Sequence, residues 1–284
     1  MIPAAFEYTR PSTVEEAVRA LADGGEYAKV LAGGQSLIPM LRLRLGDPSL
    51  LVDLGGVAEL RGVRDDGDGL VIGAMTRQAD LLRDPLIREH APLLAQAAAT
   101  VADRQVRHRG TIGGSLAHAD PAGDLPGAAL ALDATFEAVG PGGRRTIPAA
   151  DFFVEFLTTA LADDEILVSI RVPKLPGWSS HYEKFHRMAQ SWSIVGVAAA
   201  VRRDNGAIAE ARVALTNMAG KPLRARAVEE ALSGAPATAD AIRAAAAQAP
   251  DGTDPPADVW ASSDYRTHLA KVLTHRALLT TTHP

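Results

Sequence analysis

Two short glycine runs contain the groups in this sequence that are best suited to chemistry. Residues 32–36 read Ala-Gly-Gly-Gln-Ser, and residues 111–115 read Thr-Ile-Gly-Gly-Ser. Glycine permits positive φ and close approach to the backbone, and successive N–H groups in such a turn form a concavity that holds phosphate oxygens. Each run alone is also typical of a turn between a strand and a helix. Two runs, in a chain without a P-loop lysine, predict a diphosphate held between two backbone loops.

Two carboxylates, Asp120 and Asp124, follow the second glycine run. As a pair they could perform acid/base chemistry or bind a metal, whereas the simpler interpretation is an Asp-Pro turn followed by a helix cap. A third interpretation is that they accept hydrogen bonds from ribose or ribityl hydroxyls. We predict no metal site, because no spacing of His, Asp and Glu resembles one. His118 lies close to both carboxylates, either simply packed or near a cofactor.

Composition excludes several classes of function. The 284 residues include no cysteine, which excludes disulfides, a cysteine nucleophile, iron–sulfur ligation and attachment of a flavin through a thiol. The net charge of −5 and the aromatic content of 5% argue against nucleic acid as a partner. The basic segment 104–109 is therefore interpreted as a solvated or partner-docking face. Ser36 and Ser115 have no base nearby in sequence, so we do not expect a serine hydrolase.

The N-terminal residues lack the basic region and apolar core of a signal peptide. The apolar runs are also far shorter than a membrane-spanning helix requires. We therefore expect a cytoplasmic protein without a membrane span.

The elements around the first glycine run form an α/β unit. Residues 29–32 predict a short buried strand that leads into the run, and a helix is expected to begin near Leu37. Backbone N–H groups at such a strand end are suited to anions. Ser12 is the expected N-cap of an earlier helix, in a capping box with Glu15.

The second half of the chain changes its pattern. Residues 166–172 alternate like a strand, and the Pro-Lys-Leu-Pro-Gly segment at 173–177 predicts a domain boundary. Beyond it, Asp-Asn-Gly at 204–206 predicts a hairpin, and residues 264–279 predict a terminal helix. The low-complexity residues 235–256 are expected to be partly surface loop.

Longer segments around these motifs match a known family. The matching segments are residues 32–44, 111–126, 164–167, 182–185, 187–190, 224–227 and 265–278. Through them the chain resembles the FAD-binding medium subunit of molybdenum hydroxylases of the carbon monoxide dehydrogenase type, which is related to the flavin domain of xanthine dehydrogenase. The resemblance spans essentially the whole chain.

The resemblance implies an α+β (mixed α/β) fold with two domains. Residues 1–173 would form a two-part FAD-binding domain of the PCMH type, and residues 174–284 a smaller C-terminal α+β domain of the CO dehydrogenase flavoprotein type. The glycine runs would hold the diphosphate, while Asp124 and Lys184 (or His186, if the spacing shifts) would contact the flavin. Leu167 would lie near the adenine or the isoalloxazine. The implied cofactor-binding residues are Ala32, Gly33, Gly34, Gln35, Ser36, Thr111, Ile112, Gly113, Gly114, Ser115, Asp124, Leu167 and Lys184.

The function implied by the resemblance is electron transfer through FAD. A molybdopterin-containing large subunit would oxidise the substrate, and a small subunit with [2Fe–2S] clusters would pass the electrons to FAD on this chain. No residue of the chain need then be an acid/base catalyst, because the flavin supplies the redox chemistry. Two alternatives are a free-standing FAD-dependent oxidoreductase that acts directly on a small molecule, and a flavin-free binding module that retains the fold.

We predict that the chain binds FAD non-covalently, since it has no cysteine to which a flavin could be attached. Denaturation should release free FAD into the supernatant, where its absorbance and chromatography identify it. Flavin that stays on the precipitated chain, or loading with FMN alone, would contradict this prediction.

Overall fold

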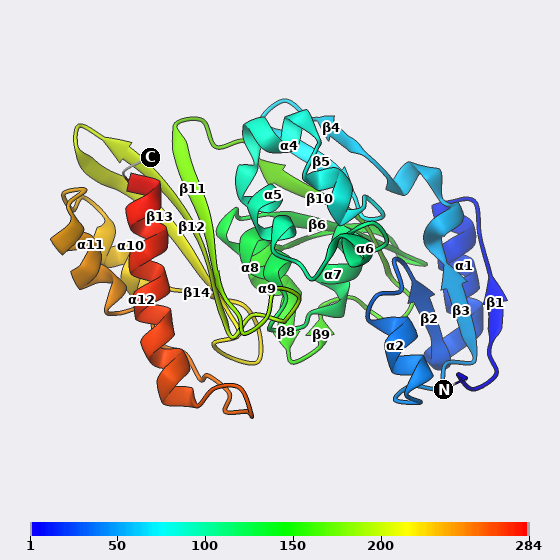
Figure 1. The fold of residues 1–284 in the computed structure, drawn as a ribbon. Coiled ribbons are helices and arrows are strands. Elements are labelled where there is room, and N and C mark those ends of the chain that lie inside the picture. The colour runs from blue at the N-terminus through cyan, green and yellow to red at the C-terminus, as the bar shows by residue number, and fades with distance from the viewer. Residues whose placement is uncertain (1, 283–284) are drawn as a thin grey trace.

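A computed structural model describes residues 2–282 of the chain, and in it three sheets follow one another from the N-terminus to the C-terminus (Figure 1). The first sheet is parallel with the order β1-β3-β2, from strands β1 (Glu7–Thr9), β2 (Ala28–Leu31) and β3 (Leu50–Asp53). Its helices are α1 (Val14–Gly24) and α2 (Leu37–Arg42), with 3-10 turns η1 (Gly25–Tyr27), η2 (Leu54–Gly56) and η3 (Ala58–Leu60). This arrangement confirms the predicted strand before the first glycine run and the helix that begins at Leu37.

Helix α1 buries one face against this small sheet. Val14, Ala17, Val18 and Leu21 recur at helical spacing, and all four are buried. The helix starts one residue later than expected, because Thr13 is the N-cap and its hydroxyl accepts from the Glu16 amide. The Glu16 carboxylate in turn accepts from the backbone and hydroxyl of Ser12. Thr13 and Glu16 thus take the places expected of Ser12 and Glu15, and the Glu16 carboxylate accepts from the N–H of Ser12 and not from that of the N-cap.

The second sheet is antiparallel and has the order β4-β5-β10-β6-β7. Its strands are β4 (Val63–Asp65), β5 (Gly69–Gly73), β6 (Thr135–Gly140), β7 (Gly143–Pro148) and β10 (Ile166–Pro173). Its helices are α3 (Gln78–Leu81), α4 (Pro85–His90), α5 (Pro92–Ala99), α6 (Arg104–Arg107), α7 (Ile112–His118), α8 (Asp124–Ala131) and α9 (Ala149–Phe152). A small hairpin, β8 (Phe153–Glu155) with β9 (Thr158–Thr159), projects from the same region.

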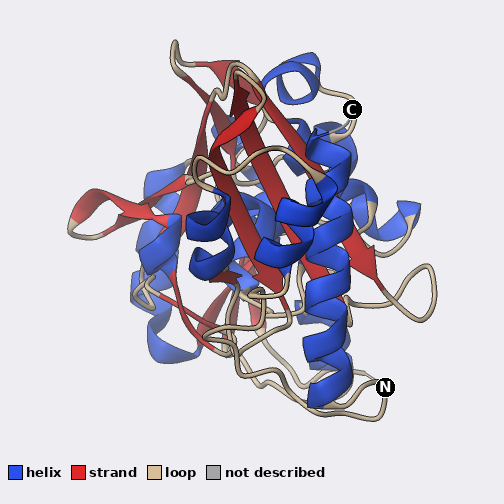
Figure 2. Cartoon of the chain, turned by 90° about the vertical axis from the view of Figure 1, so that its left-hand side faces the viewer, coloured by secondary structure: helices blue, strands red, loops and turns tan. Residues whose placement is uncertain are grey.

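The third sheet is antiparallel with the order β11-β12-β13-β14. It contains β11 (Trp178–Phe185), β12 (Val195–Asp204), β13 (Ala207–Thr216) and β14 (Leu223–Arg224). Asn205 and Gly206 join β12 to β13 with φ of 48° and 81°, which confirms the hairpin. Helices α10 (Arg226–Leu232), α11 (Ala239–Ala246) and the long α12 (Ser263–Thr282) pack on this sheet and on one another (Figure 2).

The low-complexity stretch 235–256 is more ordered than its composition suggests. Thr238 caps α11, and Ile242, Ala245 and Ala246 of that helix are buried. Alanine is small enough to let the helix lie close to α12. The expectation of a partly surface loop is confirmed by residues 247–256, which form turns and irregular, mostly exposed backbone, whereas residues 239–246 form a helix.

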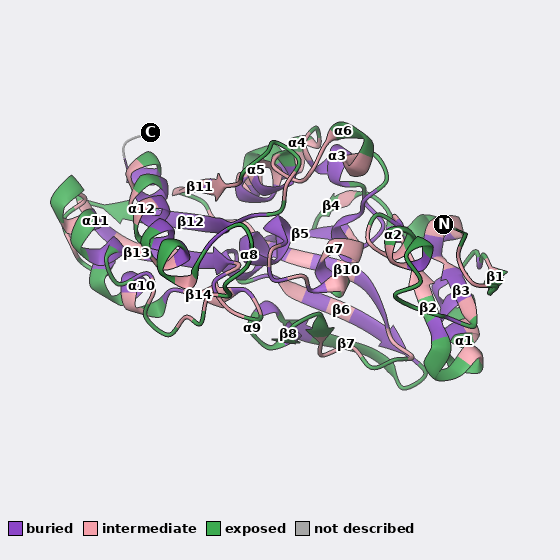
Figure 3. Ribbon diagram, turned by 60° about the horizontal axis from the view of Figure 1, so that its bottom comes forward, coloured by how far each residue is buried: buried purple, intermediate pink, exposed green. Residues whose placement is uncertain are grey.

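Helix α8 joins the second and third sheets. All eight of its residues are buried (Figure 3), and it contacts α5 and α7 on one side and β12 and β13 on the other. A helix that is buried on every side requires packing partners on every side. One hydrophobic core consequently runs from the second sheet through α8 to Tyr182, Ala198 and Ala214 of the third sheet.

Candidate cofactor-binding site

Two adjoining cavities lie where the first sheet meets the second. The larger, of about 630 Å³, is lined by the first glycine run, by the start of α2 and by parts of α7, and it reaches Lys184 on β11. The smaller, of about 410 Å³, extends along β2 and β10. The two share wall residues, which are Lys29, Val30, Ala32, Gly114, Ala117 and Leu157. Together they accommodate an elongated ligand that passes over Ala32 and Gly114.

The first glycine run presents a series of unpaired backbone amides. Among residues 2–282, no carbonyl or side chain accepts a hydrogen bond from the amides of residues 33–36. Gly34 has φ of +72°, a conformation that glycine adopts without strain. The Gln35 side chain donates to the Gly33 carbonyl at 3.0 Å, which stabilises the turn. All five residues line the larger cavity, so the run forms an anion-binding concavity there.

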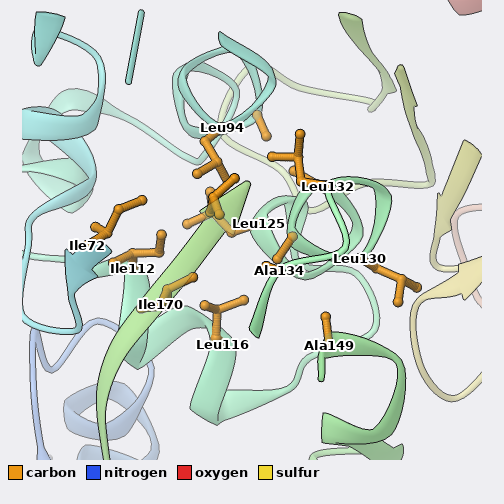
Figure 4. Packing of buried hydrophobic residues seen from close by; sticks show 14 of the residues in the cluster. Ile72, Leu94, Ile112, Leu116, Leu125, Leu130, Leu132, Ala134, Ala149 and Ile170 are labelled. Carbon is orange, nitrogen blue, oxygen red and sulfur yellow. The ribbon is translucent and has the colours of Figure 1, made fainter. Parts of the chain in front are cut away.

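The second glycine run has a different local structure from the first. It begins α7 (Figure 4 shows Ile112 and Leu116 of this helix), and three of its amides donate to the backbone carbonyls of Thr76, Ala74 and Thr111. The Gly114 amide donates to Thr111 Oγ1 at 3.1 Å. The expectation of two similar backbone cradles is therefore wrong. The second run can offer the hydroxyls of Thr111 and Ser115 instead.

The glycines in the two runs allow backbone segments to touch. A Cβ on Gly33 would overlap the carbonyl oxygen of Arg109 and would lie 2.8 Å from the Gly110 Cα. A Cβ on Gly113 would lie 2.5 Å from the Cβ of Ala74. These contacts place the first run against residues 109 and 110, which lead into the second run, and place the second run against Ala74. The first glycine of each pair is therefore required by a close contact within the chain.

A buried carboxylate closes the far end of the larger cavity. Asp124 Oδ1 accepts from the Tyr182 hydroxyl at 2.8 Å and from the Ser193 hydroxyl at 2.7 Å, while Oδ2 lies 2.8 Å from Lys184 Nζ. The side chains of Asp124 and Lys184 are only 4% and 2% exposed. Lys184 also donates to the Thr100 carbonyl at 3.0 Å. Most of the acceptor capacity of Asp124 is thus occupied by this chain itself.

The surroundings of Asp124 keep the Tyr182 phenol protonated. Burial and the adjacent carboxylate raise the pKa of Tyr182 well above its usual value, so its phenol remains a donor.

Asn217 links the segments on either side of this carboxylate. The Asn217 amide donates to the Ser193 carbonyl at 2.7 Å, and the Asn217 backbone N–H donates to the Pro121 carbonyl at 2.8 Å. Segments from three parts of the chain therefore converge on one carboxylate.

The remaining sequence-predicted residues fall into two groups. Leu167 lines the smaller cavity, at the opposite end of the site from Lys184. Ile112 lines neither cavity, because its side chain is fully buried in the core and its amide donates to Thr76. His186, the alternative to Lys184, is also not part of either wall. His118 and Asp120 do line the larger cavity.

Several wall residues were not predicted from the sequence. Lys29 lies on both walls, and no carboxylate of residues 2–282 pairs with it. Its position in the strand before the first glycine run could have identified it. Gln78, Val101 and Trp192 come from segments far apart in sequence, so only folding brings them to the cavity.

Neither a metal cluster nor a membrane span is found in the part of the chain that the structure describes. No three side chains of His, Cys, Asp or Glu within residues 2–282 are grouped so that they could hold a metal ion. None of the helices there is both long and apolar enough to cross a membrane.

Comparisons with known proteins agree in covering nearly the full chain. The family described as "FAD binding domain in molybdopterin dehydrogenase" matches residues 4–175, and the "CO dehydrogenase flavoprotein C-terminal domain" matches residues 180–281. The carbon monoxide dehydrogenase medium chain of Hydrogenophaga pseudoflava is 43% identical over 281 residues, which are 98% of this chain and 97% of that protein.

Solved structures show the same similarity. A carbon monoxide dehydrogenase chain from Hydrogenophaga pseudoflava superposes with a TM-score of 0.97 at 45% identity, covering 99% of this chain and 98% of that one. Quinoline 2-oxidoreductase from Pseudomonas putida 86 gives a TM-score of 0.95 at 34% identity, with coverage of 99% and 98%.

We predict that Gly33→Ala both destabilises the chain and weakens FAD binding, because the added Cβ would overlap the backbone of Arg109 and Gly110 and push the first glycine run away from it. Overpacking of this kind costs about 1–3 kcal/mol, measurable by urea unfolding, and FAD affinity should fall at least tenfold. Gly142→Ala is the matched control, since a Cβ there meets nothing within 4 Å. A Gly33→Ala protein with the stability and FAD affinity of the control would show that the runs do not need this contact.

We predict that Asp124→Asn is strongly destabilising although it preserves the shape of the side chain. Asparagine can still accept from Tyr182 and Ser193, but it leaves the Lys184 ammonium buried without a counter-charge, a loss of about 3–5 kcal/mol. Adding Lys184→Met should recover part of this loss in a double-mutant cycle. The exposed Asp80→Asn serves as control, and an Asp124→Asn chain as stable as that control would contradict the role assigned to the pair.

Proposed function

Because the chain belongs to the family of FAD-binding medium subunits of molybdenum hydroxylases, we propose that it holds FAD in the two adjoining cavities and passes electrons from a partner's iron–sulfur clusters to an external acceptor. The family and the mixed α/β fold agree with the resemblance drawn from the sequence. The unpaired amides of residues 33–36, which line the larger cavity directly after the shared wall residue Ala32, carry the assignment of the cofactor to this site.

The residues present fit a dinucleotide. Its diphosphate needs donors, and the first glycine run supplies four amides on the wall of the larger cavity, directly after Ala32, which both cavities share. Ser36, Thr111 and Ser115 add hydroxyls along the same wall. Lys29 adds a positive charge on the wall that both cavities share, which favours an anion.

We assign roles to the remaining wall residues on this basis. Ala32, Gly114 and the run at 33–36 would hold the diphosphate, while Leu167 would lie against one ring system in the smaller cavity. Lys184 and Asp124 would act mainly on each other and would shape the far end of the larger cavity. Gly113 and Ile112 would serve the packing of α7, not the ligand. These assignments follow from burial and from the hydrogen bonds already made within the chain.

The chain's own part in the reaction is to bind and orient FAD, which supplies the redox chemistry when bound. The absence of cysteine means that the iron–sulfur clusters must lie on another subunit. A molybdopterin-containing large subunit and a [2Fe–2S] small subunit are the partners expected of the family. The relative solved as part of a carbon monoxide dehydrogenase is consistent with such an assembly.

We further propose a division of the chain after residue 173 and a cytoplasmic location. Strand β10 ends at Pro173 and β11 begins at Trp178, so residues 174–177 link the second and third sheets. A chain without cysteine is compatible with a reducing compartment. Fractionation of the native host, with an antibody to this chain, tests the location.

The assembly is tested by purifying the tagged chain from its native host. We expect two further subunits to copurify, with molybdenum and iron in the complex and FAD that is released on denaturation. A chain that purifies alone, carries FAD and oxidises a small molecule without partners would favour a free-standing flavoenzyme. A chain that purifies without any flavin absorbance would favour a binding module.

A further inference from the structure

Gln78 is a buried residue of the cavity wall with unused hydrogen-bonding capacity. It begins α3, is 5% exposed and lines the larger cavity. Within residues 2–282 its Oε1 atom is buried without a hydrogen-bond partner. Of the buried side-chain atoms there that lack a partner, only this one belongs to a residue of either cavity wall. An unsatisfied buried polar group is costly and therefore requires an explanation.

The position of Gln78 is fixed by the second glycine run. Its backbone amide donates to the Gly110 carbonyl at 2.9 Å, and the neighbouring Ile112 amide donates to the Thr76 carbonyl at 3.0 Å. Gly110 also makes room for the side chain, because a Cβ there would lie 2.9 Å from Gln78 Oε1. The fold thus fixes the backbone of Gln78 at one place on the wall.

The wall around the carboxamide is otherwise mainly apolar. Val101, Ala102 and Val106 line the same cavity. Ala102 has φ of +38°, an uncommon conformation for a residue with a Cβ. Arg107 holds this segment, since its Nη1 donates to the carbonyls of Val101 and Ala102 at 2.6 and 3.2 Å. A rigid apolar wall with one carboxamide suits a flat ring that carries polar atoms on its edge.

We propose that the Gln78 carboxamide hydrogen-bonds the edge of a heteroaromatic ring of the bound dinucleotide. A carboxamide has a donor and an acceptor in one plane, which matches a ring edge with neighbouring N–H and C=O or ring-nitrogen groups. The isoalloxazine and the adenine of FAD both have such an edge. This inference rests on the proposed function, because it requires FAD in the larger cavity.

The test compares FAD affinity in the full-length wild-type chain and Gln78→Leu. We expect about tenfold weaker FAD binding in the variant, corresponding to the loss of one or two hydrogen bonds. Without FAD, the variant should unfold at the same temperature as wild type or higher, because the substitution removes an unpaired buried amide. A merely structural role for Gln78 predicts the opposite, a less stable apoprotein.

Two further probes identify the ring. If the isoalloxazine contacts Gln78, the variant should show shifted flavin absorbance and a shifted midpoint potential, since hydrogen bonds to the ring tune its electronics. If the adenine contacts Gln78 instead, the variant should lose ADP affinity by the same factor as FAD affinity, while its flavin spectrum stays unchanged. Either result supports the proposal.

The controls separate this proposal from the assignment of FAD itself. Gln105→Leu makes the same change at an exposed residue outside both cavity walls, and it should bind FAD like wild type. Gln78→Met, which keeps an unbranched chain, replaces Gln78→Leu if the latter does not fold. Wild type that carries no FAD would overturn the proposed function. Wild type that carries FAD, with unchanged affinity, spectrum and potential in either Gln78 variant, would overturn the role of Gln78 alone.

Discussion

The hydrogen bonds of the Asp124 carboxylate are the interaction on which the arrangement of the molecule depends. Asp124 begins α8, the helix between the second and third sheets, whereas Tyr182 and Lys184 lie on β11 and Ser193 precedes β12. A buried charge is tolerated only when it is paired and hydrogen-bonded. Because each partner comes from a different place in the chain, satisfying this one carboxylate requires that the C-terminal sheet lie against α8.

The same requirement shapes the cofactor site. Lys184 reaches the cavity because its ammonium is drawn to Asp124 and to the Thr100 carbonyl. Trp192 lines the cavity and is 57% exposed, and the segment that carries it is held by Asn217 and by Arg266, which donates to the Ile194 carbonyl. A ligand in the larger cavity would therefore contact the third sheet and the segment before β12 as well as the first glycine run, whose unpaired amides follow β2 of the first sheet.

Close backbone contact is the second constraint on the site. Gly33 must approach Arg109, and Gly113 must approach Ala74, before the wall between the two cavities can form. The two glycine runs look equivalent in sequence, yet the amides of the first run have no partner within residues 2–282, whereas amides of the second run donate to the carbonyls of Thr76, Ala74 and Thr111. A pair of glycines in the sequence indicates that some group approaches the backbone closely at that point. The sequence does not show whether that group is a ligand or another segment of the chain.

The sequence by itself determined the local elements and the chemistry of the first glycine run. The strand before residue 32, the helix at Leu37 and the hairpin at Asn205 follow from apolar spacing and turn residues, which act over a few positions. Tertiary structure decided the rest, including the cap at Thr13, the helix at 239–246, the partners of Asp124 and the placing of Gln78 on the wall. Apart from the cap at Thr13, which is a choice between neighbouring residues, these features depend on groups that lie tens of residues apart, and hydrogen bonding and burial select them only after the chain has folded.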